Sequence, residues 1–243
     1  MPQFQNQHFS KDQDIHHLAT HHLAEQDEEV HYLNCTFTGL ELNGLNGTTF
    51  TKCCFVASSF ASCTARSSRF EHCEFYDRDN ETGTNFKFAD LQDCTFDHCD
   101  MSLADFSRSK LYQTEFIGCQ MTGANFLSAT SCHTIGNSVE LSSVTFTDCN
   151  FAYADLRNIR MPEADFSGSR MSHVHLDKAD LTDAVLADCE LHQVEAEGIM
   201  LRGADLRGAT LSGLDVRQID VTGVKIDALQ APIILESLGM IVT

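Results

Sequence analysis

The chain of 243 residues contains 35 acidic and 16 basic residues and has a formal charge of −19 at pH 7. This balance argues against direct binding of nucleic acid, because a nucleic-acid-binding protein needs cations to neutralise phosphates. Hydrophobic residues make up 42% of the chain, which is enough for a continuous core. The sequence contains no run of about 18 apolar residues, so we expect no membrane span.

Residues 1–34 are predicted to form a polar, His-rich N-terminal extension or cap. The start, MPQFQNQHFSKDQD, lacks a basic end followed by an apolar segment, so we expect no secretory signal and a cytoplasmic location. If helical, the segment HHLATHHLAEQDEE places His17 and His21 on one face, where they could share a metal ion. Such a pair needs further ligands, so we interpret the segment as a helical cap and predict no metal and no cofactor.

From residue 35 to residue 227 a large residue returns every five positions. Five fits neither the helical period of 3.6 nor the strand period of 2, and a fixed short period is typical of stacked repeats. The residue two before each large one is usually Ala, Ser or Cys. The clearest frame positions are Phe50, Phe55, Phe60, Phe70, Phe75, Phe86, Leu91, Phe96, Phe106, Phe116, Phe126, Phe146, Phe151, Leu156, Phe166, Leu181 and Leu206, and the frame continues through Val216 and Val221 to Ile226.

Stretches such as ADLRGATLSG resemble the pentapeptide-repeat family, whose chain coils as a right-handed quadrilateral β-helix with one pentapeptide on each side. The resemblance implies that the large residue and the small residue two before it point inward, while the other three positions face water. We therefore predict an all-β fold: a right-handed quadrilateral β-helix with two loops and a short C-terminal helix. An ordinary β-sandwich would need a period of two, which the sequence does not show.

The positions of the eleven cysteines argue against disulfides and a metal site and favour packing in the core. Nine of them occupy the small inward position, where a free cysteine behaves as a compact hydrophobic residue. No CxxC pair is present. The nine are Cys35, Cys53, Cys63, Cys73, Cys94, Cys99, Cys119, Cys149 and Cys189.

The repeat is first interrupted in FYDRDNETGTNF, where Phe75 and Phe86 are eleven positions apart, one more than two repeats. The surplus residue would shift every later side chain, so we expect this segment to loop out. Asp79, Asn80 and Gly83 supply the turn chemistry. We call this segment loop 1; it comprises Tyr76, Asp77, Arg78, Asp79, Asn80, Glu81, Thr82, Gly83 and Thr84.

A second irregularity lies between Phe126 and Leu141. The frame is kept, with Leu141 as a frame residue, but Ser131 and Gly136 occupy centre positions that they cannot fill. We expect this segment to leave or distort the coil, and loops on a rigid scaffold often determine binding specificity. We call it loop 2; it comprises Cys132, His133, Thr134, Ile135, Gly136, Asn137, Ser138, Val139, Glu140, Leu141, Ser142 and Ser143.

Residues 228–243 are predicted to form the C-terminal helix and a dimerisation tail. Pro232 suits the first turn of a helix and Gly239 suits its end. The tail leaves apolar residues without a coil to cover, which favours a homodimer; the alternative is a tail that folds back as a monomer cap. The predicted dimer residues are Ile234, Leu235, Leu238, Met240, Ile241 and Val242.

The order of these parts resembles the Qnr quinolone-resistance proteins from about Cys35 to the C-terminus. The matching pieces are CEFYDRDNETGTNF, CDMSLADF, GANF and DVRQIDVTGVKIDALQAPIILESLGMIVT. The resemblance implies a cytosolic dimer that binds DNA gyrase and topoisomerase IV and protects them from fluoroquinolones. It also implies that the two loops are important for protection.

Outward carboxylates recur just before the centres, for example at Asp105, Asp155 and Asp205. A rod of this kind, about as wide as duplex DNA, could occupy a groove built for DNA; alternatively, its acidic surface only keeps the protein soluble. The sequence has no GxxxxGK, GxSxG or HExxH motif, so we expect that the protein is not an enzyme. The alternative functions are immunity to another topoisomerase toxin and a structural scaffold, although a plain scaffold has no need for two loops.

Overall fold

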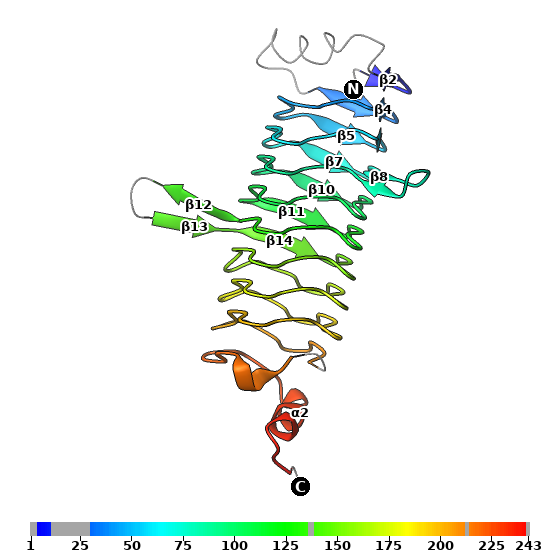
Figure 1. The fold of residues 1–243 in the computed structure, drawn as a ribbon. Coiled ribbons are helices and arrows are strands. Elements are labelled where there is room, and N and C mark those ends of the chain that lie inside the picture. Colours follow the sequence, from blue (N-terminus) through cyan, green and yellow to red (C-terminus); the bar gives the residue numbers. More distant parts are fainter. Residues whose placement is uncertain (1–3, 11–29, 136–138, 212–213, 242–243) are drawn as a thin grey trace.

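The computed structural model describes residues 4–10, 30–135, 139–211 and 214–241, which form a long stack of coils followed by a short helix (Figure 1). The strands that stack along the coil are β1 (Phe4–Gln5), β2 (His8–Ser10), β3 (His31–Leu33), β4 (Thr36–Thr38), β5 (Thr49–Thr51), β6 (Cys54–Val56), β7 (Arg69–Glu71), β10 (Thr95–Asp97), β11 (Thr114–Ile117) and β14 (Val144–Thr147). Two hairpins project from the stack, β8 (Tyr76–Asp77) with β9 (Thr82–Gly83) and β12 (Cys132–Ile135) with β13 (Val139–Ser142). The chain ends with the 3₁₀ turn η1 (Val216–Gln218) and the helix α2 (Gln230–Ser237).

Successive coils pair in parallel, and the chain passes four sides in each coil. One side is a sheet in the order β1-β3-β5-β7-β10-β11-β14, in which Phe96 pairs with Phe116. The other sides are joined by β2-β4-β6 and by single bridges between residues twenty apart, such as Asp90 with Lys110. We number the sides 1 to 4 by their centre residues, which include Phe86, Phe106 and Phe126 on side 1, Leu91, Leu111 and Met161 on side 2, Phe96, Phe116 and Phe146 on side 3, and Met101, Met121 and Phe151 on side 4.

The core is a set of stacked side chains that runs along the axis of the rod. On side 3, the rings of Phe70 and Phe96 lie 4.7 Å apart and 3° from parallel, and Phe96 continues the stack to Phe116 at 4.9 Å. Rings of opposite sides meet edge to face across the core, as Phe106 of side 1 and Phe116 of side 3 do at 5.9 Å. These geometries are the favoured ones for aromatic pairs, and all four rings are fully buried. The period of five is therefore the period of the core, and the predicted fold class is confirmed.

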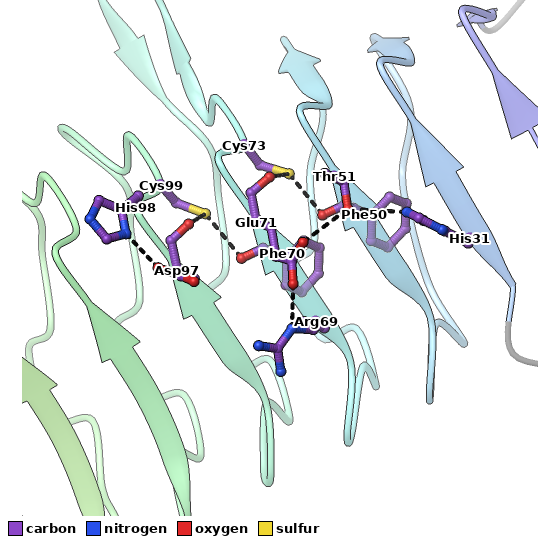
Figure 2. A network of polar contacts seen from close by, with 10 residues as sticks. All are labelled: His31, Phe50, Thr51, Arg69, Phe70, Glu71, Cys73, Asp97, His98 and Cys99. Atoms are coloured by element: carbon purple, nitrogen blue, oxygen red, sulfur yellow. Dashed lines mark hydrogen bonds and ion pairs between the residues drawn. The ribbon is translucent and has the colours of Figure 1, made fainter. Parts of the chain in front are cut away.

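Nine of the eleven cysteines pack in the core, as predicted for the small inward position. All eleven are free, and the nine in the small position are buried. Seven of these nine lie in a column between sides 3 and 4, where each thiol contacts a carbonyl of the preceding coil, such as Cys99 Sγ with the Phe70 carbonyl at 3.4 Å (Figure 2). Burial raises the pKa of Cys63 and Cys94 to about 12, so these thiols remain protonated and unreactive at neutral pH.

The described coil begins before the predicted start at Cys35. Phe4 in β1 stacks on Tyr32 at 4.8 Å, and Phe9 in β2 stacks on Phe37 at 5.0 Å. These apolar rings are therefore part of the stack, because they cover the rings of the first complete coil. His17 and His21, on which the helical cap was predicted, lie outside the described residues.

The repeat ends earlier than its frame suggests. Leu211 is the last centre residue that is buried, whereas Val221 is 49% exposed. The turn η1 replaces a regular side at Val216, and no complete coil follows to cover Val221. No helix in the described part of the chain combines the length and apolarity that a membrane crossing needs.

The helix α2 closes the C-terminal end of the coil. Pro232 lies in its first turn, and Gly239, with φ of +82°, follows its last turn, as predicted. The Gly239 N–H donates to the Glu236 carbonyl at 2.9 Å and the Met240 N–H donates to the Leu235 carbonyl at 3.0 Å, which is a Schellman ending. At the other end, Gln230 Nε2 donates to the carbonyls of Leu206 and Ala209, so the helix is fastened to the last coil.

Candidate protein-interaction site

Loop 1 projects as a short hairpin from the corner between sides 4 and 1. Tyr76 pairs with Gly83 and Asp77 with Thr82, in antiparallel strands. Below the hairpin, the rings of Phe75 and Phe86 remain 5.2 Å apart, so the core passes it without a gap. The surplus residue therefore leaves the coil, as expected.

A carboxylate organises the inside of loop 1. Asp77 accepts hydrogen bonds from Asn80 Nδ2 at 2.8 Å and from the backbone N–H groups of Asp79 and Asn80 at 3.0 and 3.2 Å. The hydrogen bond from the Asn80 side chain, followed by those from the backbone, holds the pKa of Asp77 below its usual value. Asp77 and Thr84 are buried, so only residues 78–82 form the exposed tip, which is shorter than the predicted loop.

Loop 2 is a longer hairpin at the diagonally opposite corner, between sides 2 and 3 (Figure 1). Ser131 stays in the coil at a centre position and is fully buried. Leu141 is 38% exposed on β13, so its interpretation as a frame residue is wrong: the hairpin displaces it, and the frame resumes with Val144 and Phe146. Gly136, Asn137 and Ser138 lie outside the described residues.

Two side chains of side 2 support loop 2, and sequence reasoning missed both. The ring of Tyr112 stacks on His133 at 4.9 Å, and the Arg160 guanidinium forms an ion pair with Glu140. Tyr112 and Arg160 occupy ordinary outward positions of the repeat. The only signal in the sequence is their position in the repeats of side 2, the side at whose end loop 2 leaves the coil.

The surface is acidic because 35 acidic residues outnumber 16 basic ones, and most of the arginines form ion pairs with carboxylates of the same chain. Arg66 pairs with Asp90, and Arg207 pairs with Asp205, each at 2.6 Å. The hydrogen bond from Arg207 lowers the pKa of Asp205. Ion pairs of exposed arginines add little stability. Because they occupy most of the arginines, few cations of the chain remain to balance its other carboxylates. Among the described residues, no three His, Cys, Asp or Glu side chains are arranged to hold a metal ion.

The C-terminal end carries an exposed apolar surface around α2. Leu235, Leu238, Met240 and Ile241 are between 37% and 89% exposed. Ile234 instead packs partly against the core and lines an apolar pocket of about 390 Å³ with Leu206, Leu211 and Val221 among others. Of the predicted dimer residues, Val242 lies outside the described residues, and Ile234 is already partly covered within the chain.

Comparison with known families agrees with this geometry. A model described as pentapeptide repeats matches residues 89–126, 140–177, 164–203 and 184–223, in eight copies. These segments together cover about half of the chain. The chain belongs to the pentapeptide-repeat family, whose repeat forms the four-sided coil described above.

Within that family the chain is related to the Qnr proteins. It is 33% identical over 118 residues to the quinolone resistance protein QnrB96 of Scandinavium goeteborgense, covering 49% of this chain and 51% of the relative. It is 35% identical over 82 residues to QnrB4 of Escherichia coli, covering 34% of this chain and 38% of the relative. The matched part therefore spans about half, or less, of the length of these relatives.

The structures agree over more of the chain. A trypsin-treated form of QnrB1, a plasmid-mediated fluoroquinolone resistance protein, superposes with a TM-score of 0.77 at 28% identity, covering 86% of this chain and 97% of QnrB1. Full-length QnrB1 gives a TM-score of 0.65 at 27% identity, covering 84% and 97%. The fold is thus similar to that of a resistance protein over more of the chain than sequence comparison detects.

Proposed function

We propose that this protein binds type II topoisomerases, DNA gyrase and topoisomerase IV, and protects them from fluoroquinolones without catalysing a reaction. The relatedness to QnrB96 and QnrB1 supports this proposal, since both are named for quinolone resistance. Loop 1 and loop 2 are the proposed contact segments. The protein is expected to work as a homodimer in the cytoplasm.

The observation that carries the proposal is the pair of hairpins on an uninterrupted core. The coil continues beneath loop 1, where Phe75 contacts Phe86, and beneath loop 2, where Phe126 and Phe146 are 5.9 Å apart. Neither hairpin is needed to complete the core, and the described strands of both project from the coil (Figure 1). A rigid scaffold that presents two exposed loops is typical of a recognition protein.

The acidic surface supports a partner that normally binds DNA. Carboxylates recur along one side of the coil, as Asp105 and Asp155 do two coils apart, with Asn125 in the coil between them. A groove lined with cations for phosphates would attract such a surface, and the attraction would weaken as salt rises. The protein would therefore act as an acidic mimic of DNA, which occupies the groove where the enzyme binds DNA and does not itself bind DNA.

A supercoiling assay tests the proposal. Gyrase and relaxed plasmid are incubated with an inhibitory concentration of ciprofloxacin and increasing amounts of the purified protein, and the decatenation of DNA by topoisomerase IV is assayed in parallel. We expect supercoiling to recover with the wild-type protein but not with a variant that lacks both hairpin tips. Absence of recovery with either enzyme, in the presence of a folded excess of wild type, would contradict the proposal and favour an immunity or scaffold role.

A further inference from the structure

The corners of the coil place many side chains in an unusual backbone conformation. The corner residue, two after each centre, has a positive φ in most coils, for example 55° at Leu103 and 59° at Ser128. This left-handed region suits glycine and asparagine and disfavours large side chains. A bulky apolar residue at a corner is therefore placed against its backbone preference, and a corner also faces solvent.

Three large apolar residues nevertheless occupy such corners. Phe88, Leu103 and Tyr153 have φ values of 60°, 55° and 62° and are 49%, 46% and 61% exposed. All three border side 1. Among the described residues, the left-handed corners on either edge of side 3 carry only polar or charged side chains and glycine, including Ser67, His72, Asp93, His98, Gln113, Asp148, Glu163, Asp183 and Asp188.

Leu103 lies directly against loop 1, and Tyr153 is on the same edge of the coil, two corners further along. Gly83 of the hairpin lies on the Leu103 backbone so closely that an added Cβ would be 2.1 Å from the Leu103 carbonyl carbon. The Leu103 side chain extends over the next corner, where a Cβ on Gly123 would be 2.6 Å from Leu103 Cδ2. The following corner is Tyr153, whose ring stacks on His173 at 4.7 Å and 3°.

Leu103, Tyr153 and His173 thus form a ridge along the corner between sides 4 and 1, starting under loop 1. We call it the corner ridge. Phe88, on the other edge of side 1, differs because its ring already has Arg108 and Lys87 within 5.6 and 5.7 Å of its centroid. At Leu103, Gly123 and Tyr153 the ridge presents side chains without charge on a chain with a charge of −19. A few buried anchor residues, tyrosine among the most frequent, carry most of the binding energy in protein interfaces, while surrounding charges orient the approach.

We propose that the corner ridge is part of the surface that binds the topoisomerase, with Leu103 and Tyr153 as its apolar anchors. The inference rests on the proposed function, because it takes the occupant of the ridge to be the enzyme that loop 1 contacts. The fold does not require these two side chains, since glycine occupies the corner between them. Loop 1 and the ridge form one continuous surface, so a protein that covers loop 1 also reaches Leu103.

Asparagine substitution separates binding from stability. Asparagine accepts a positive φ, so Leu103→Asn, Tyr153→Asn and the double variant should fold with a melting temperature equal to or above that of wild type. Ser128→Asn is the matched control: it makes the same backbone exchange at an exposed corner on the other edge of side 1 and removes no apolar surface. Binding to immobilised gyrase and to topoisomerase IV is measured for all four, together with the protein concentration that half-restores supercoiling in ciprofloxacin.

We expect the double variant to bind about ten-fold more weakly than wild type or worse, and to need a correspondingly higher concentration for protection. Each single variant should lose part of this affinity. Ser128→Asn should bind and protect like wild type. A well-folded double variant that binds and protects like wild type would overturn the ridge alone. Wild type that neither binds nor protects either enzyme would overturn the proposed function and this inference with it. Equal losses of binding in the double variant and in Ser128→Asn would also count against the ridge, because the cause would then be the asparagine at a corner and not the loss of the apolar side chains.

Discussion

Ser131 Oγ and Ser142 Oγ lie 2.7 Å apart, although eleven positions separate the two residues in the chain. Ser142 Oγ also donates to the Pro162 carbonyl of the next coil at 2.7 Å. The contact closes loop 2 at its base, so the hairpin leaves and rejoins the coil at nearly the same point. Ser131 is too small to fill a centre position, but its buried hydroxyl has a hydrogen-bond partner.

Removal of Cys132–Leu141 should therefore leave a regular coil. The ten deleted residues equal two pentapeptides, and the deletion brings Phe126 and Phe146 ten positions apart. We expect a soluble variant with the circular dichroism of wild type and a similar melting temperature, because an exposed loop is removed. Protection of gyrase from ciprofloxacin should be lost. Full protection by the folded deletion variant would show that loop 2 is not a contact segment.

Deletion of Arg78–Gly83 is the corresponding experiment on loop 1. It brings Phe75 and Phe86 five positions apart and keeps the buried Thr84 in the small inward position. Thr84 Oγ1 already donates to the Phe75 carbonyl at 2.8 Å, so the junction is compatible with the coil. We expect normal folding and weaker protection in the supercoiling assay. A folded variant with unchanged protection would remove loop 1 from the interface.

Asp77 should control the order of the loop 1 tip. Asp77→Ala removes the acceptor for Asn80 and for two backbone N–H groups, so trypsin should cleave after Arg78 faster than in wild type at pH 7. Because the pKa of Asp77 is lowered in the folded loop, this stabilisation is present above the ordinary pKa of aspartate and is lost as pH falls through the folded value. NMR titration should therefore place its midpoint below 3.8. Unchanged cleavage at Arg78 would contradict the assigned role.

The frame of the core can be tested with one aromatic residue. Phe106 is fully buried between Phe86 and Phe126, with both ring centroids at 4.7 Å. Phe106→Ala should lower the free energy of unfolding by about 3–5 kcal/mol because it leaves a cavity. Arg157→Ala is the control, since Arg157 is exposed and forms its ion pair with the partly buried Asp155; it should change stability little. Similar losses in the two variants by chemical denaturation would invalidate the frame.

The dimer can be tested at α2 without removal of the helix. Truncation after Leu229 should give monomers or insoluble protein, but it also removes Gln230, which holds the last coil. Leu238→Glu with Met240→Glu instead adds charge to the exposed apolar surface. We expect wild type to sediment as a dimer at micromolar concentration, this variant as a folded monomer with weaker protection, and a control with Gln218→Glu and Thr222→Glu as a dimer. A monomeric wild type would refute the proposed dimer.

The sequence by itself determined the repeat, the inward positions and the two interruptions. A side chain such as Phe96 or Cys99 has its environment set by its place in a five-residue unit, and that place is local information. The same local rule predicted that the segment after Phe75 must loop out, because a surplus residue within the coil would move every later side chain out of its inward or outward position. Pro232 and Gly239 marked the helix for a similar reason, since each limits the backbone of its own residue.

Only the tertiary structure decided how these units meet across coils. Leu141 keeps the frame by count, yet it is exposed, because β12 pairs with β13 and carries it away from the core. Tyr112 supports His133, and Gly83 contacts Leu103, although each pair is about twenty residues apart in the chain. Such contacts depend on which corner a loop leaves and on which side chains the next coil presents there. The repeat fixes the pitch and direction of every coil locally, but the surface that a partner meets is assembled from several coils at once.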